Sequence, residues 1–160
     1  SEATEVDAAM QASSAPAIAM LPQPYVTTAQ MQMENLTVAL DLTEEWDKVS
    51  PDSALVTGVL VVRKDFAEAN PDAVELMIQE YNSSVEYVNA NVEDAAKLVV
   101  EYGIVPKEPV AVKAIPECNI VCITGEDMKA KVSGYLNVLF EQDASSVGGA
   151  VPADDFYYGA

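Results

Sequence analysis

Short, largely apolar runs are the first pattern along this chain. They occupy residues 17–21, 38–42 and 55–62, and charged and turn-forming residues follow the last of them. A continuous apolar run of this length is typical of a strand that is buried on both faces of a parallel sheet. The pattern therefore predicts three strands at these positions.

Between these runs, apolar residues recur at helical spacing. The clearest case follows Asn70-Pro71 and predicts a long helix, because one stripe with a period of 3.6 residues collects Val74, Met77, Ile78, Tyr81, Val85 and Val88. Gly103 would end a further helix that runs from Asn91 to Tyr102. Other helices are predicted to begin near Thr4, Pro22, Thr43 and Thr124.

The alternation of helices and strands predicts an α/β fold, in which a small, mostly parallel sheet carries helices on its faces. Three strands are few for such a sheet. Its edges would expose unpaired backbone groups, which normally need a partner. We therefore expect the chain to be part of a larger fold or to self-associate through exposed sheet edges.

Composition narrows the classes of function. The 160 residues are half hydrophobic, which suits one ordinary domain with a core, and they include 26 acidic but only eight basic residues, for a net charge of −18. Such a charge excludes the binding of nucleic acids and repels anionic membranes. No run approaches the roughly 18 to 20 apolar residues that span a bilayer, and no signal-peptide pattern opens the chain.

Metal and cofactor chemistry is not indicated. The chain has no histidine, and Cys118 and Cys122 are its two cysteines, so that none of the common structural zinc sets can form. In a strand these cysteines would lie about 13 Å apart, beyond the reach of a disulfide, whereas in a helical turn they could meet. Two buried thiols that act as small hydrophobic side chains are the favoured interpretation.

No group is marked for catalysis. Neighbouring carboxylates occur at Glu44-Glu45, Glu126-Asp127 and Asp154-Asp155, but adjacent residues do not face one another on a helix or strand. We therefore expect solvated caps and turns at these pairs. Gly148-Gly149 lacks the lysine and the following helix of a phosphate-binding loop and is expected to form a turn.

Ligand-binding residues are expected at the carboxyl ends of the predicted strands, where open α/β sheets bind ligands. Pro22, Gln23 and Tyr25 join a strand to a helix N-terminus, whose free N–H groups favour an anionic or carbonyl group. Thr57 and Gly58 interrupt an apolar strand and permit close approach of a ligand to the backbone. A proline-capped helix and a packing glycine remain as alternatives.

Several of these segments, in order, resemble bacterial ABC-transporter solute-binding proteins of the alkanesulfonate, taurine and thiamine-precursor type. They are Glu2–Val6, residues 18–27, Asp41–Trp46, the strand and turn at 57–66, and residues 146–149 with 154–158. The resemblance implies the two-lobed periplasmic-binding-protein type II architecture. It places this chain in the C-terminal half, with about residues 1–41 in the distal lobe and about 55–160 in the return crossing and the helical C-terminal part.

The resemblance also implies a function. The chain would capture a small organic solute, such as a sulfonate or a thiamine precursor, between two lobes and deliver it to an ABC permease, without catalysis and without a cofactor. Pro22, Gln23 and Tyr25 would line one side of the cleft, Thr57 and Gly58 its floor, and Trp46 would form an aromatic wall or else a core residue. Gln23 stands where the family often has an acidic residue.

The resemblance also implies where the protein is located and which other functions compete with solute binding. The full-length form would be extracytoplasmic, as a membrane-anchored lipoprotein or a periplasmic protein. Thiamine-pyrimidine synthases share the resemblance but depend on histidine, which this chain lacks. The alternative to solute binding is an interaction module, or a degenerate fragment that no longer binds a solute.

Overall fold

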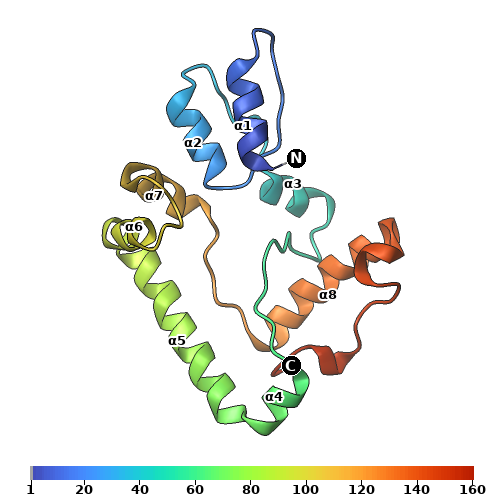
Figure 1. Cartoon of the computed structure of the whole chain (residues 1–160). Coiled ribbons are helices and arrows are strands. Elements are labelled where there is room, and N and C mark those ends of the chain that lie inside the picture. The colour runs from blue at the N-terminus through green and yellow to red at the C-terminus, as the bar shows by residue number, and fades with distance from the viewer. Residues whose placement is uncertain (1) are drawn as a thin grey trace. The chain divides into compact units, whose positions relative to one another are not determined.

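The computed structural model describes residues 2–160, and the described residues form two compact units (Figure 1). The first unit extends to Thr37 and resumes at Asp72–Cys122, and the second comprises Val38–Pro71 and Ile123–Ala160. The chain therefore passes from one unit to the other three times. The predicted division near residues 41 and 55 follows a different criterion, the resemblance, and stays a prediction.

The expected α/β fold is wrong. Residues 2–160 form eight α-helices and three short 3-10 helices, with no strand or sheet among them. The apolar runs at 17–21, 38–42 and 55–62 have no regular structure apart from Leu42, which begins a helix. A strand exists only where a second extended segment exchanges backbone hydrogen bonds with it, and none does so here. The two-lobed sheet architecture and self-association through sheet edges are wrong for the same reason.

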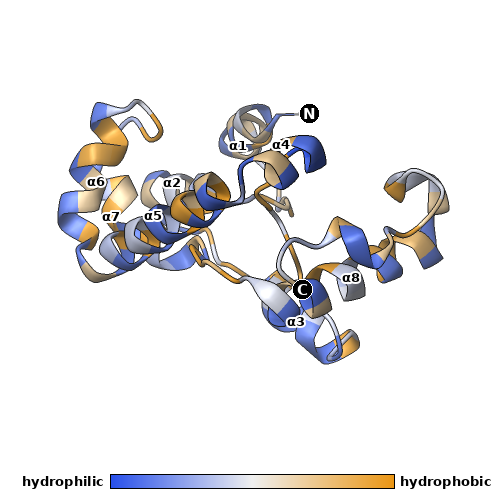
Figure 2. Cartoon of the chain, turned by 90° about the horizontal axis from the view of Figure 1, so that it is seen from below, coloured by the Kyte–Doolittle hydropathy of each residue, from blue (hydrophilic) through white to orange (hydrophobic). Residues whose placement is uncertain are grey.

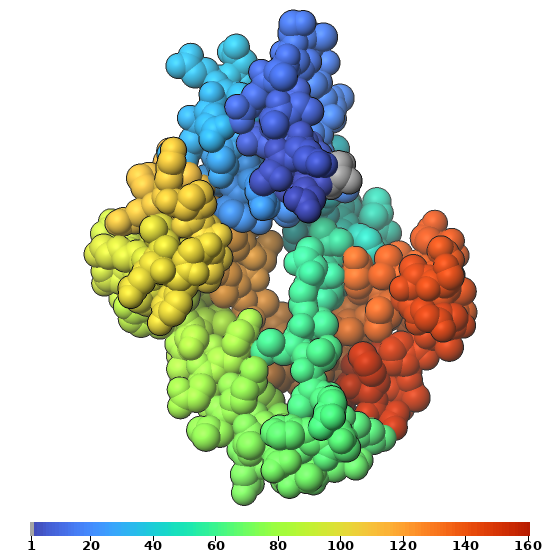
Figure 3. Space-filling view, viewed as in Figure 1, coloured from blue at the N-terminus to red at the C-terminus, as the bar shows by residue number. Residues whose placement is uncertain are grey.

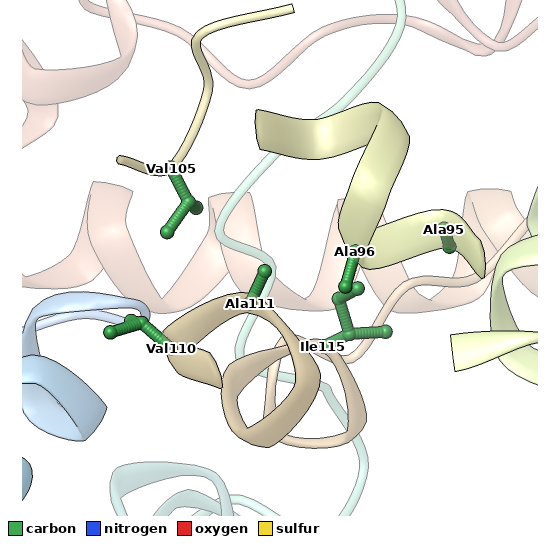
Figure 4. Close-up of a cluster of buried hydrophobic side chains, with 6 residues drawn as sticks. All are labelled: Ala95, Ala96, Val105, Val110, Ala111 and Ile115. Atoms are coloured by element: carbon green, nitrogen blue, oxygen red, sulfur yellow. The ribbon is translucent and has the colours of Figure 1, made fainter. Parts of the chain in front are cut away.

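The first unit contains five helices and one hydrophobic cluster. These helices are α1 (Ala3–Ala12), α2 (Tyr25–Gln32), α5 (Pro71–Ala90), α6 (Val92–Glu101) and α7 (Glu108–Ala114), followed by a 3-10 turn at Ile115–Glu117. The cluster lies mainly between α6 and α7 and consists of Ala95, Ala96, Val105, Val110, Ala111 and Ile115 (Figure 4). Its small alanines allow the two helices to pack closely.

Four of the five helices of this unit, α1, α2, α5 and α6, lie where the sequence pattern predicts them, whereas α7 was not predicted. Along α5, Val74 and Val85 are buried and Ile78, Tyr81 and Val88 are half-buried, whereas Met77 is exposed. Figure 2 shows both hydrophilic and hydrophobic residues along this helix. After α6, Gly103 takes the left-handed conformation (φ +70°) that was expected of it.

The second unit contains α3 (Leu42–Val49), α4 (Lys64–Ala69) and α8 (Gly125–Gln142), with 3-10 turns at Ala144–Val147 and Asp154–Phe156. Asp41 caps α3, because its carboxylate accepts hydrogen bonds from the N–H groups of Thr43 (2.8 Å) and Glu44 (3.2 Å). Among the described residues of this unit, only Tyr157 is a buried hydrophobic side chain.

The helix α8, predicted to begin near Thr124, has no buried residue. The second unit therefore has almost no core of its own. No helix within residues 2–160 has the length and apolar character needed to cross a membrane.

Candidate functional site

The turn that leads into α2 holds three of the predicted ligand-binding residues, Pro22, Gln23 and Tyr25. Pro22 is exposed, and Gln23 and Tyr25 are half-buried. The side-chain oxygen Oε1 of Gln23 accepts hydrogen bonds from the N–H of Thr27 (3.3 Å) and from its hydroxyl (2.8 Å). Thr27 is buried, with 5% of its surface exposed, so that this pair of bonds fixes the orientation of the Gln23 amide.

The N–H groups of the first turn of α2 are all engaged within the chain. Tyr25 and Val26 donate to the carbonyl of Pro22 (2.9 and 3.2 Å), Thr27 donates to Gln23, and Thr28 donates to the carbonyl of Pro24 (3.0 Å). The expected mode of binding, in which free N–H groups hold an anion, is therefore not offered by this helix.

Two polar groups at the same turn have no recorded partner among the described residues. They are the Nε2 amide of Gln23 and the hydroxyl of Tyr25. The amide is a donor and the hydroxyl is both donor and acceptor, so each is able to hold an oxygen atom of a ligand. The sequence singled out both residues but assigned the interaction to the backbone.

Trp46 belongs to the second unit and makes internal contacts. Its indole N–H donates to the hydroxyl of Ser53 (2.8 Å), and its ring lies 5.2 Å from that of Tyr135, centroid to centroid, at 53°. These contacts join α3, the turn after it and α8. They agree with the core role that the sequence left open, and a role of Trp46 in ligand binding stays a prediction.

Thr57 and Gly58 are exposed residues of the same unit. A Cβ atom added at Gly58 would meet nothing within 4 Å, so packing does not require glycine at this position. The six predicted residues therefore divide between the units: Pro22, Gln23 and Tyr25 lie in the first, and Trp46, Thr57 and Gly58 in the second. Only the members of the α2 turn are brought together locally, and a ligand-binding role for Thr57 and Gly58 stays a prediction.

A groove of about 470 Å³ lies beside α1 and was not predicted from the sequence. Its volume is in the range of small-molecule sites. Its polar members are engaged locally, since Glu5 accepts from the N–H of Glu2 (3.2 Å) and Ser13 donates to the carbonyl of Ala15 (2.9 Å). The groove is lined mostly by apolar atoms from Glu5, Val6, Ala9, Met10, Ser13 and residues 17–19.

A charged cluster in the second unit was also missed. The Nζ atom of Lys129 lies 3.1 Å from Asp154 and 6.0 Å from the centre of the Tyr157 ring. The hydrogen bond to Asp154 raises the pKa of Lys129, and burial raises the pKa of Tyr157, so both groups keep their protons at neutral pH. Lys129 and Tyr157 therefore act in this cluster as hydrogen-bond donors, beside the exposed carboxylate of Asp154.

The same acidic pair also anchors the C-terminal segment. Asp155 pairs with Lys64 of α4, and this hydrogen bond lowers the pKa of Asp155 and raises that of Lys64. Asp154 and Asp155 thus bind two lysines of different helices. The expectation that adjacent carboxylates are caps and turn residues agrees with their place in a 3-10 turn.

The two cysteines are free and half-buried. Burial, with a smaller contribution from Glu117, raises the pKa of the Cys118 thiol, which keeps it in the unreactive protonated form at neutral pH. Within residues 2–160 no group of three or more Cys, Asp or Glu side chains is arranged to hold a metal ion.

Comparison with known families identifies the chain's relatives. The sequence model of a family described as menaquinone biosynthesis matches residues 25–137. The chain belongs to this family. The matched range includes Tyr25, Trp46, Thr57 and Gly58, and it begins two residues after Gln23. No curated protein and no solved structure gives a significant match.

The family corrects the predicted function. The resemblance to ABC-transporter solute-binding proteins is wrong, and with it the roles in transport, in solute capture and in docking on a permease. The expectation that the chain is not an enzyme is also wrong, because the family comprises enzymes of the menaquinone pathway. The resemblance misled because short apolar runs and turns reflect how a segment packs and not what it does. One fold can also carry many functions. The predicted extracytoplasmic location stays a prediction.

Proposed function

We propose that this chain acts in one enzymatic step of menaquinone synthesis and binds an intermediate of that pathway through the α2 turn. The match of the menaquinone biosynthesis family to residues 25–137 supports this proposal. The substrate is defined only as an intermediate of the pathway.

The geometry of the α2 turn supplies two hydrogen-bonding groups for such a substrate, one of which is held in place. Thr27 holds the Oε1 atom of Gln23, so that the Nε2 amide points away from this bond and is available to a substrate oxygen. The hydroxyl of Tyr25 is the second group. A side chain that is already held in place loses little entropy on binding, which favours a positioning role for Gln23.

Tyr25 also offers the simplest route for a proton. The chain has no histidine, so that general acid or base catalysis falls to tyrosine, lysine, thiol or carboxylate groups. Lys129, Asp154 and Tyr157 are already engaged with one another, whereas the Tyr25 hydroxyl has no recorded partner among residues 2–160. Tyr25 is therefore the best-placed proton donor of the α2 turn, and it lies within the residues that the family model matches.

The experiment combines the purified chain with each menaquinone-pathway intermediate in turn and follows its consumption by mass spectrometry. The decisive variant is Gln23→Glu, because a carboxylate still accepts the two hydrogen bonds from Thr27 but has no Nε2 donor. We expect consumption of one intermediate and at least a tenfold lower kcat/KM in this variant, with an unchanged melting temperature.

The matched control is Gln30→Glu, which makes the same chemical change at an exposed position of α2. It should retain the activity of the unmodified chain. If the folded chain consumes none of the intermediates, the proposed catalytic role is wrong. If Gln30→Glu loses as much activity as Gln23→Glu, the added charge and not the lost donor is responsible, and Gln23 does not position the substrate.

A further inference from the structure

Residues 152–157 near the C-terminus contact two helices of the second unit; we refer to these residues as the C-terminal strap. Asp155 forms an ion pair with Lys64, the first residue of α4, and Asp154 forms one with Lys129 of α8 (3.1 Å). In Figure 3 the red atoms at this end of the chain lie beside the orange atoms of α8. The strap therefore joins α4 to α8 within the second unit.

The contacts of the C-terminal strap with these helices are made by side chains. Its recorded backbone hydrogen bonds stay within the strap, since the N–H of Phe156 donates to the carbonyl of Ala153 (3.0 Å) and that of Tyr157 donates to Asp154 (3.2 Å). Among the described residues, no recorded backbone hydrogen bond joins residues 152–157 to α4 or α8. A segment of this kind can separate from its neighbours by local unfolding, without breaking a backbone hydrogen bond to them.

Two of the three docking contacts depend on charge. The side chains of Asp154 and Asp155 are 91% and 69% exposed, and that of Lys64 is 62% exposed. Ion pairs between exposed groups add little stability and are screened by salt. The third contact is the ring of Tyr157, which is 6% exposed and lies 6.0 Å from the Nζ atom of Lys129. The strap is thus held by one buried ring and by two contacts that salt weakens.

We propose that the C-terminal strap is a conformational device controlled by ionic strength. At low salt it docks on α8 and holds α4, and at high salt it detaches and releases α4 with it. The helix α4 spans only six residues, and a helix of this length is not stable by itself in water. Its order should therefore depend on the ion pair between Lys64 and Asp155. This inference is independent of the proposed enzymatic step.

The test measures hydrogen exchange of the backbone amides in the whole chain at low salt and in 1 M sodium chloride, where the Debye length falls to about 3 Å. We expect the amides of the strap and of α4 to exchange at least fivefold faster in 1 M salt. Amides in the middle of α8 should change by less than twofold. A synthetic peptide of residues 152–160 gives the effect of salt on the exchange of an unstructured chain.

A pair of chain variants locates the effect. Asp155→Asn removes the charge that pairs with Lys64 and keeps the size of the side chain, so that α4 and the strap should exchange rapidly even at low salt. The matched control is Asp127→Asn, which makes the same change at a carboxylate that pairs with Lys131 within α8, at 3.9 Å. The control should exchange like the unmodified chain. A melting temperature for each variant identifies any that has lost its fold.

Three outcomes would overturn the proposal. The first is exchange in the strap and in α4 that does not respond to salt, which would show that the ion pairs do not hold them. The second is faster exchange in the strap without a change in α4, which would make residues 152–157 a frayed terminus. The third is equal acceleration in Asp127→Asn and Asp155→Asn, which would assign the effect to net charge.

Discussion

At the scale of single residues, Gly134 is the glycine of the second unit at which an added side chain would meet the closest neighbouring atoms. A Cβ atom at this position of α8 would lie 2.9 Å from the Cβ of Ser53 and 3.2 Å from the carbonyl oxygen of Asp52. The missing side chain thus lets the turn after α3 lie directly on α8. The same turn carries the Ser53 hydroxyl that accepts the indole N–H of Trp46. One glycine and one hydroxyl therefore organise the contact between α3 and α8.

We expect Gly134→Ala to destabilise the chain by about 1–3 kcal/mol, because the added methyl group displaces backbone atoms as well as a side chain. The measurement is urea unfolding followed by the fluorescence of Trp46, the single tryptophan of the chain. Gly58→Ala is the matched control, since its new methyl group meets nothing within 4 Å, and it should be neutral or slightly stabilising. Equal losses in the two variants would contradict this account.

At the scale of elements, α6 and α7 form the best-packed pair. Ala95 and Ala96 of α6 and Ala111 of α7 are at most 1% exposed. Because alanine carries only a methyl group, the helix axes can approach one another and seat Val105 and Val110 at the margin of the contact (Figure 4). The small side chains at this interface are therefore as important for packing as the larger ones.

Ala96→Leu should destabilise the first unit by about 1–3 kcal/mol, because the filled space between α6 and α7 cannot accept three more carbon atoms. Circular dichroism at 222 nm during urea unfolding measures this change. Ala90→Leu, at an exposed end of α5, should cost less than about 0.5 kcal/mol. A similar loss at both positions would mean that packing between α6 and α7 is not the cause.

The elements also show which parts of the fold were predictable. The helices at α5, α6 and α8 follow from apolar residues at helical spacing, and the end of α6 follows from Gly103. The helix α4 spans only six residues, which is too short for a periodic pattern, and it was missed. The apolar runs were assigned to strands because their composition suits strands, but composition cannot supply the neighbouring strand that pairing requires.

At the scale of the whole molecule, the two units are stabilised by separate sets of contacts. The first unit has the α6–α7 cluster, whereas the second relies on the contact of Trp46 with Tyr135, on Gly134 and on the ion pairs of the C-terminal segment. Two sets of contacts without shared members predict two units of local stability.

Hydrogen exchange in the native state tests this prediction. Ala96→Leu should accelerate exchange of the amides in α6 and α7 and leave those of α8 unchanged, and Gly134→Ala should do the reverse. We expect the slowest exchange in the first unit, where almost all of the buried residues lie. If either substitution accelerates exchange in both units to the same degree, the chain opens as one cooperative unit instead.

The sequence alone determined the helical periodicities, the absence of histidine, the high negative charge and, through the match over residues 25–137, the family. It also drew attention to Gln23 and Tyr25. The tertiary structure decided that Trp46 packs on Tyr135 and that the apolar runs have no paired strand among residues 2–160. The reason is physical: a helix satisfies its hydrogen bonds within a few residues, whereas strand pairing and the packing of aromatic rings depend on distant segments of polypeptide.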